Sequence, residues 1–169
     1  MNGFKEAVQA FFANLPVPLW ARIMLCAMLP MIEARYSILF FMDSGYAYWQ
    51  LFLLSVLGNM LPIPFIIYLF RPLLGFLRRT NLFSTLAKRI EERTMKKSEQ
   101  LQKYSAFGLF VFVAIPLPGT GAITGAMIAA LLDMRELYAL PALFFGTVTA
   151  TFLTTGAMTI IQNMLSLIF

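Results

Sequence analysis

Residues 29–35 read LPMIEAR and residues 115–121 read IPLPGTG, and these two proline-broken stretches decide the fold. The first sets Glu33 and Arg35 into otherwise apolar sequence, and the second lies in the middle of an uncharged run over residues 104–132. A broken backbone and a charged side chain are both costly inside a lipid bilayer, so they occur mainly where they line a cavity. The two stretches therefore predict a transporter rather than a passive membrane anchor.

The composition indicates an integral membrane protein with one domain. Of the 169 residues, 60% are hydrophobic and 12% are charged, whereas a soluble domain has about 25% charged residues. The chain has no His, which excludes histidine-based triads, histidine metal sites and histidine proton transfer. Its one Cys forms neither an internal disulfide nor a zinc cluster, and no P-loop or Gly-x-Ser-x-Gly motif is present. We therefore expect no enzyme activity, no cofactor and no metal.

Positive charge is concentrated in one stretch of the chain. Nine of the 13 basic residues lie within residues 71–103, where only three acids accompany them. The positive-inside rule places this stretch in the cytoplasm. Apolar segments flank it on both sides, so we expect an amphipathic helical segment near anionic lipid rather than a nucleic-acid-binding element.

Apolar and charged residues divide the single domain, 1–169, into six segments. We expect an interfacial helix, a re-entrant helical hairpin, a transmembrane helix, the basic helical segment, a second re-entrant hairpin and a last transmembrane helix. Their ranges are 1–16, 17–43, 44–70, 71–103, 104–134 and 137–169. The pieces on either side of Pro30 are each shorter than a spanning helix, and the alternative to the first hairpin is a single kinked span.

The two hairpin-plus-helix units follow one plan. Each has a proline break followed by a glycine in the next span, with 28 residues from Pro30 to Gly58 and 30 from Pro116 to Gly146. The first hairpin is expected to enter the membrane from outside and the second from the cytoplasm. This predicts an all-α membrane protein built as an inverted repeat, the architecture of many secondary transporters.

Three motifs resemble the small multidrug export family: Pro30-x-x-Glu33-x-Arg35, Gly58-Asn59, and PLPGTGAITGA at residues 116–126. The resemblance covers roughly residues 17–160. That family is similar to the wider DedA, or SNARE-associated (VTT domain), membrane superfamily. Members of the superfamily are implicated as flippases that return undecaprenyl phosphate across the bacterial inner membrane. The resemblance therefore implies a location in the bacterial cytoplasmic membrane and a lipid-phosphate substrate.

The resemblance also implies roles for single residues. The superfamily pattern has an acid in the first re-entrant loop and basic residues around the second. Glu33 matches the acid, and Arg35 matches the acid-x-Arg spacing of the nearer family. The second loop carries no Arg, and Arg135 is the candidate that lies beyond the returning half-helix.

The chemistry of these side chains suggests a proton-coupling centre. Desolvation at membrane depth favours the neutral form of a carboxylate, so Glu33 can gain and lose a proton. Arg35 stays charged and could hold an anionic substrate or keep Glu33 ionised. The alternative is a structural ion pair of Glu33 with Arg35 or with Arg135, which would fix the hairpin.

The second break is expected to bind an anion. Its residues Pro118, Gly119, Thr120 and Gly121 offer backbone N–H groups at a half-helix N-terminus, where the helix dipole favours negative charge. The alternative is a tight glycine turn without a ligand. Asn59, Thr120 and Thr124 are candidate polar lining, and each could equally bond backbone freed by a nearby proline.

Together these features predict a proton-coupled transporter or flippase of an anionic amphiphile such as undecaprenyl phosphate. The alternatives are a multidrug exporter of hydrophobic cations and a non-transporting membrane scaffold. Expected partners are membrane lipids, an amphiphilic small molecule or lipid phosphate, and protons, with no nucleic acid. A homodimer fits a chain of this size.

Overall fold

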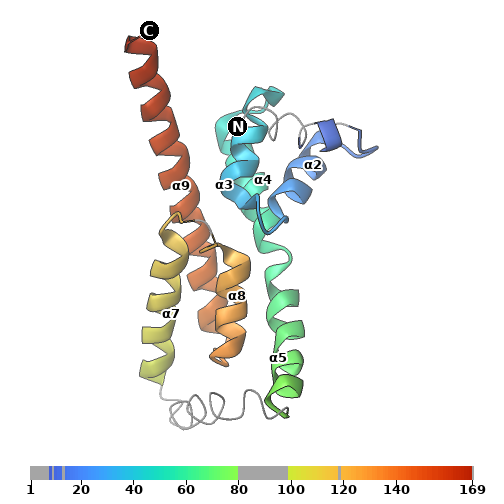
Figure 1. Ribbon diagram of the computed structural model, residues 1–169, viewed down its shortest axis with the longest axis vertical. Helices are drawn as coiled ribbons and strands as arrows, with labels where there is room; N and C mark the ends of the chain where they lie inside the picture. The colour runs from blue at the N-terminus through green and yellow to red at the C-terminus, as the bar shows by residue number, and fades with distance from the viewer. Residues whose placement is uncertain (1–7, 9, 13, 80–98, 118, 169) are drawn as a thin grey trace.

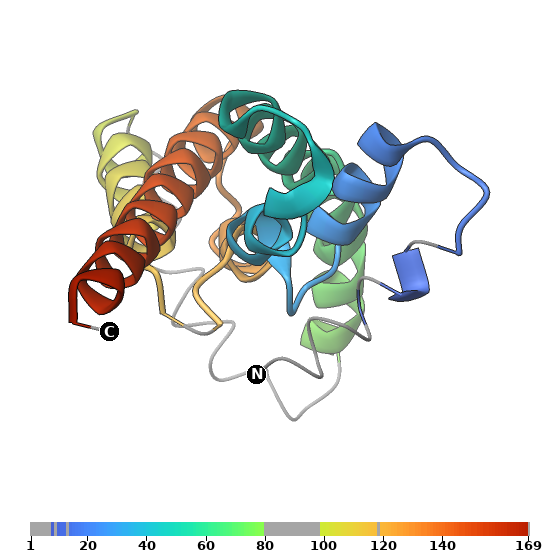
Figure 2. The same cartoon turned by 90° about the horizontal axis from the view of Figure 1, so that it is seen from above.

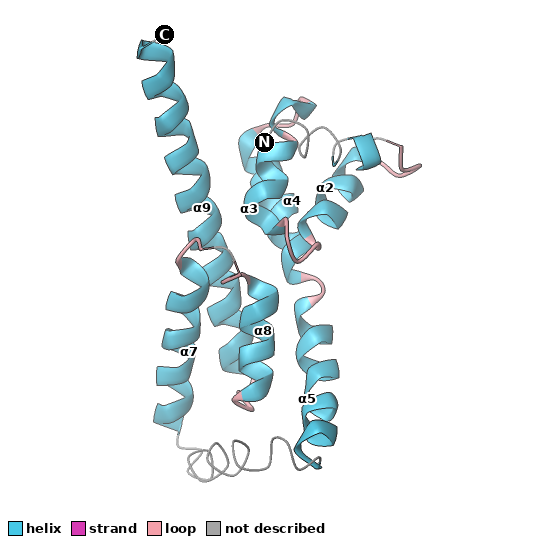
Figure 3. Ribbon diagram, in the orientation of Figure 1, coloured by secondary structure: helices cyan, strands magenta, loops and turns pink. Residues whose placement is uncertain are grey.

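The computed structural model describes residues 8, 10–12, 14–79, 99–117 and 119–168. Within these residues the chain is helical, with no strand (Figure 3), which confirms the all-α fold class. The helices are α2 (Leu19–Ala27), α3 (Glu33–Phe40), α4 (Tyr48–Met60), α5 (Ile63–Arg79), α7 (Glu99–Ala114), α8 (Ala122–Leu131) and α9 (Glu136–Ile168), with a 3-10 turn over Met42–Ser44. Most of the expected interfacial helix and residues 80–98 of the basic segment lie outside the described residues.

The first proline break joins two short antiparallel helices. α2 has nine residues and α3 has eight, so each is only about 12–14 Å long. The hydroxyl of Ser37 in α3 donates a hydrogen bond to the carbonyl oxygen of Ile23 in α2 at 3.0 Å. The two helices therefore fold back on each other at Pro30 and do not form one kinked rod.

The segment that follows is broken once in its middle. α4 ends at Met60 and α5 begins at Ile63, because Pro62 lacks the N–H that a continuous helix needs. The helix does not stop at residue 70, however, but runs through Arg71 and Pro72 to Arg79. The apolar stretch long enough to cross a membrane is Tyr48–Leu74, with 27 residues and a mean hydropathy of 1.9.

The second half repeats the order of elements with longer helices. α7 begins at Glu99, five residues before the predicted start of the hairpin at residue 104. It ends at Ala114, and α8 returns from Ala122 after the second break. α9 then continues for 33 residues through Pro141. Its stretch Glu136–Met158 is the second one long and apolar enough to cross a membrane, with a mean hydropathy of 1.5.

The helices form two halves stacked along the long axis of the molecule. In Figure 1, α2, α3 and α4 fill the upper half, α5, α7 and α8 fill the lower half, and α9 passes through both. Seen from above, α3 lies over α8 near the centre (Figure 2). Each half has its own apolar core: α2, α3 and α4 build the upper one, and α5, α7, α8 and α9 build the lower one.

A glycine lets each hairpin approach the span that follows it. A Cβ on Gly58 of α4 would lie 2.5 Å from the carbonyl oxygen of Met24 in α2. A Cβ on Gly146 of α9 would lie 2.9 Å from Cβ of Val113 in α7. Helices meet this closely only where a side chain is missing, so the two glycines serve equivalent contacts.

Candidate functional site

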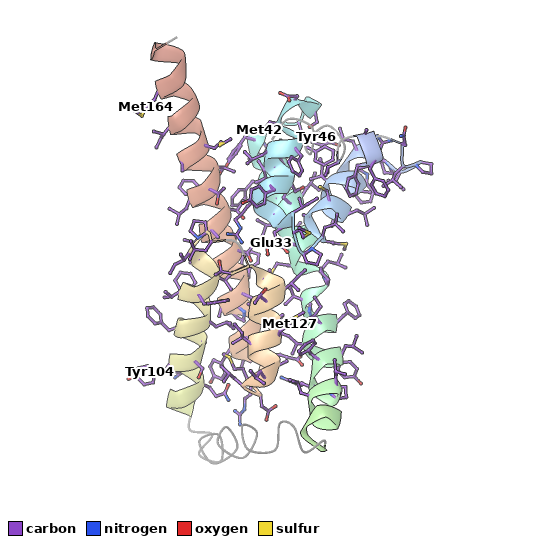
Figure 4. The ribbon with its side chains drawn as sticks, viewed as in Figure 1. Glu33, Met42, Tyr46, Tyr104, Met127 and Met164 are labelled. Carbon is purple, nitrogen blue, oxygen red and sulfur yellow. The ribbon has the colours of Figure 1, made fainter. Side chains whose placement is uncertain are left out.

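The charged pair of the first break lies buried at the junction of the two halves. Glu33 and Arg35 are each only 6% exposed, and Nη2 of Arg35 forms an ion pair with Oε2 of Glu33. Nη1 of Arg35 lies 3.5 Å from the carbonyl oxygen of Leu117 in the second break. Figure 4 shows Glu33 at mid-height of the molecule, between the upper and lower helices. Glu33 thus forms its ion pair with Arg35, and Arg35 also contacts the second break.

Gly121 makes the room that the carboxylate of Glu33 occupies. A Cβ added to this buried glycine would overlap both carboxylate oxygens. The sequence predicts Gly121 as one of four residues that offer backbone N–H groups to an anion. The carboxylate of the first break occupies the space beside Gly121, so the two broken segments fit into each other.

Two helices begin at this carboxylate and run away from it in opposite directions. Glu33 is the first residue of α3, and Gly121 is the N-cap of α8. Neither N-terminus has a side-chain cap, and N–H groups in the first turn of a helix lack intrahelical partners. The N–H of Glu33 itself already donates to the carbonyl oxygen of Leu29 at 2.9 Å. The positive ends of both helix dipoles, together with Arg35, surround one negative group. The carboxylate of Glu33 thus lies between the guanidinium of Arg35 and the N-terminus of α8.

The backbone of Glu33 has an unusual conformation. Its φ is +53°, in the left-handed region that residues other than glycine rarely adopt. Such conformations persist where surrounding contacts hold them, and they are concentrated at functional sites. Here the conformation turns the chain from the break into α3 and keeps the carboxylate beside Gly121.

Polar side chains from both spans complete the lining. Asn59 of α4 and Thr147 and Thr151 of α9 border the same narrow space as the ion pair, which measures about 160 Å³ and has no room for a water-sized sphere. Asn59 Oδ1 and the two threonine hydroxyls are buried without a hydrogen-bond partner in the described part of the chain. Asn59 was predicted to line the site, whereas the two threonines were not. The signal for them was their spacing of four residues on one face of the last helix.

The remaining candidates of the second break form its turn. The hydroxyl of Thr120 lies 2.7 Å from the carbonyl oxygen of Ile115 and accepts a hydrogen bond from the N–H of Leu117 at 3.2 Å. Gly119 has a φ of +86°, which suits glycine in a tight turn. These two residues thus hold the backbone of the break, as the alternative interpretation of this segment predicted. Pro118 lies outside the described residues.

Two other predicted residues lie away from the ion pair. Thr124 is half-buried on α8 and does not border the space around Glu33. Arg135 is exposed beyond the far end of α8, about 15 Å of helix from Gly121. Its backbone N–H donates to the side chain of Gln102 at 3.1 Å. The structure therefore does not bring Arg135 to the site, because α8 carries it to the opposite end of the lower half.

Among the described residues, no group of three or more His, Cys, Asp or Glu side chains could hold a metal ion. The site consists of one carboxylate, one guanidinium, neutral polar side chains and two helix N-termini. Such a set contains one carboxyl group, Glu33, and one permanent cation, Arg35, which can pair with an anion.

A model of the family described as "Putative small multi-drug export protein" matches residues 33–153. The matched region begins at Glu33 and extends through Thr151, so it contains the whole lining of the site. It covers more than two thirds of the chain. No curated protein and no solved structure matches.

Proposed function

The chain belongs to the small multi-drug export family, and we propose that it is a proton-coupled membrane transporter whose exchange site is the Glu33–Arg35 pair. The family and the two long apolar helices indicate a transporter in a membrane. The finer proposal concerns the substrate and the coupling, and it is supported by the surroundings of Glu33. Arg35 and two helix N-termini surround this single carboxylate.

Protonation of Glu33 would change what the site can hold. With Glu33 ionised, the ion pair is neutral overall and the site is self-contained. With Glu33 protonated, Arg35 becomes a buried cation without a counter-ion, which is a costly state. An anionic head group that pairs with Arg35 and the helix N-termini relieves that cost. Binding of a proton and of an anion are thereby linked, which is the basis of coupled transport.

The proposed substrate is an amphiphile with an anionic head, such as a polyprenyl phosphate. Its apolar tail suits a site between helices that face lipid, and its phosphate suits Arg35. In this proposal the two hairpins are re-entrant and the two halves form an inverted repeat. The equivalent glycine contacts at Gly58 and Gly146 support that relationship. The basic segment then marks the cytoplasmic side of a bacterial inner membrane.

The second candidate is export of hydrophobic cations, which the family description favours. In that mechanism Glu33 binds the drug and the proton in turn. Arg35 would then compete with the drug for the carboxylate. The two candidates therefore make opposite predictions for removal of the Arg35 charge.

Transport by the purified full chain in liposomes tests the proposal. The probes are a fluorescent alkyl phosphate and ethidium, each with and without a pH gradient. We expect the gradient to drive the alkyl phosphate, Arg35→Gln to abolish that transport, and Glu33→Gln to uncouple it from the gradient. Arg135→Gln is the matched control, because that arginine lies outside the site.

Three outcomes separate the candidates. Loss of phosphate transport in Arg35→Gln, with Arg135→Gln active, supports the anion mechanism. Ethidium transport that survives or increases in Arg35→Gln supports cation export instead. Full transport of either probe by the double variant Glu33→Gln/Arg35→Gln would contradict both mechanisms, since no charge would remain in the site.

A further inference from the structure

Buried polar side chains without partners continue from the site along the seam between α4 and α9. Ser55 and Thr151 are 0% exposed, Asn59 is 1% exposed and Thr147 is 3% exposed. Ser55 Oγ, Asn59 Oδ1 and both threonine hydroxyls have no hydrogen-bond partner within the described chain. Leaving buried polar atoms unbonded costs stability, so these four atoms are available to water or to another polar group.

The spacing of these residues gives the seam a direction. Ser55 and Asn59 are four residues apart on α4, and Thr147, Thr151 and Thr155 repeat every four residues on α9. Residues four apart share one face of a helix. The lower members of both rows border the space around Glu33. The rows then lead one to two turns upward, away from the carboxylate.

At its upper end the seam reaches the surface. The hydroxyls of Tyr48 and Thr155 lie 2.5 Å apart and join the first turn of α4 to α9. The Tyr48 side chain is 44% exposed. A line of hydroxyl and amide groups therefore runs from an exposed tyrosine to a buried carboxylate.

We propose that the seam between α4 and α9, formed by Tyr48, Thr155, Thr151, Ser55 and Asn59, is the path by which protons reach Glu33 once water enters between the two helices. This proposal rests on the proposed function, which assigns proton binding to Glu33. It adds the route that the proton takes and the direction of that route. Hydroxyl and amide groups can both donate and accept hydrogen bonds, so they can order a file of water molecules. The described lining residues offer no acid or base besides Glu33 and the permanently charged Arg35.

The path opens at one end of the molecule. α4 begins at the upper end of Figure 1, whereas α5 ends and α7 begins at the lower end. Both of these lower helix ends belong to the basic segment, residues 71–103. If the basic segment is cytoplasmic, the path opens on the opposite side of the membrane. A proton entering there would move down the usual gradient across a bacterial inner membrane.

The rate at which Glu33 takes up a proton tests the path without any transported substrate. The full chain in liposomes is subjected to a rapid pH drop, and the carboxyl infrared band that disappears in Glu33→Gln is followed in time. Thr151→Val and Ser55→Ala each remove one hydroxyl of the path. We expect each to slow protonation about tenfold, the factor that corresponds to about 1.4 kcal/mol of added barrier.

Matched variants separate the path from general damage to the helices. Thr154→Val makes the same change on α9, but the hydroxyl of Thr154 donates within its own helix to the carbonyl oxygen of Ala150 at 2.8 Å. This variant should protonate at the original rate, and so should Thr151→Ser, which keeps the hydroxyl. In vesicles of one orientation, Glu33 should follow the pH of the Tyr48 side.

Each outcome separates the path from the proposed function. Normal protonation rates in both Thr151→Val and Ser55→Ala, or a response to the pH of the basic-segment side, would overturn the path and leave the Glu33 mechanism standing. A Glu33 band that never titrates would overturn the path and the proton coupling together. Slow protonation in the two hydroxyl variants, with both matched variants normal, would establish the path.

Discussion

The two breaks occupy corresponding places in the two halves, yet they supply different things to the site. The first break brings charge, because Glu33 and Arg35 follow its proline within α2–α3. The second break contributes backbone groups and space. Gly121 leaves room for the carboxylate of Glu33, and the carbonyl oxygen of Leu117 lies 3.5 Å from Nη1 of Arg35. Neither break makes the site alone. A binding site between two repeated units can thus be shared unequally, with charge on one side and an open helix end on the other.

The largest effect should come from breaking the charged pair of the first break. Arg35→Met leaves Glu33 buried without its counter-ion, and such a loss costs about 3–5 kcal/mol of unfolding free energy. Glu33→Gln/Arg35→Met removes both charges and should restore most of that stability. Reversible unfolding in detergent micelles measures both.

Arg22 provides the comparison for that experiment. Arg22 is half-buried on α2, and its Nε donates to the carbonyl oxygen of Val17 at 2.8 Å. Arg22→Met should therefore lower the free energy of unfolding by only about 1 kcal/mol. Equal losses in Arg35→Met and in the double variant would show that the pair is not an interdependent unit.

The next largest effect should come from substituting the glycines that contact the two hairpins. In Gly58→Ala the new Cβ would lie 2.6 Å from Cα of Met24, backbone that moves only with all of α2. In Gly146→Ala the nearest atoms are Cβ of Val113 at 2.9 Å and the carbonyl oxygen of Phe110 at 3.1 Å, so the overlap is smaller. We expect Gly58→Ala to cost about 1–3 kcal/mol and Gly146→Ala to cost less.

Gly156→Ala calibrates this pair of variants. Nothing lies within 4 Å of a Cβ there, so the better helix propensity of Ala should add up to about 1 kcal/mol of stability. Thermal unfolding in micelles should rank the three variants with Gly156→Ala highest and Gly58→Ala lowest. The reverse rank would mean that the second hairpin is the more tightly docked one.

The smallest effect should come from the turn of the second break. Thr120→Val removes the hydroxyl that bonds Ile115 and Leu117, which should cost about 1 kcal/mol of local stability. Faster hydrogen exchange at the Leu117 amide would show it. Thr120→Ser keeps the hydroxyl and should exchange like the original chain. Equal exchange in both variants would indicate that the glycines alone define the turn.

Local signals made part of this architecture predictable. Prolines 30, 62 and 116 stop or redirect helices through their own chemistry, so the positions of the breaks could be inferred from sequence. The burial of Glu33 and Arg35 could also be predicted, because both charged residues lie within apolar sequence. These features depend on a few neighbouring residues.

Features that depend on tertiary contacts could not be inferred in the same way. The fit of Glu33 against Gly121 requires two segments 88 residues apart to meet. Thr147 and Thr151 join the site only because α9 packs beside α3 and α4. Arg135 was a reasonable candidate by charge, but the length of α8 carries it away.

Solid-state NMR of the native chain in lipid bilayers tests most directly whether the two breaks meet at Glu33. With carbon-13 in the Glu carboxyl groups and in the Gly α-carbons, the structure predicts a strong through-space contact between Glu33 Cδ and Gly121 Cα. That cross peak should disappear in Glu33→Gln. A spectrum of the native chain without it, in which Glu33 contacts only Arg35, would contradict a site shared between the two halves.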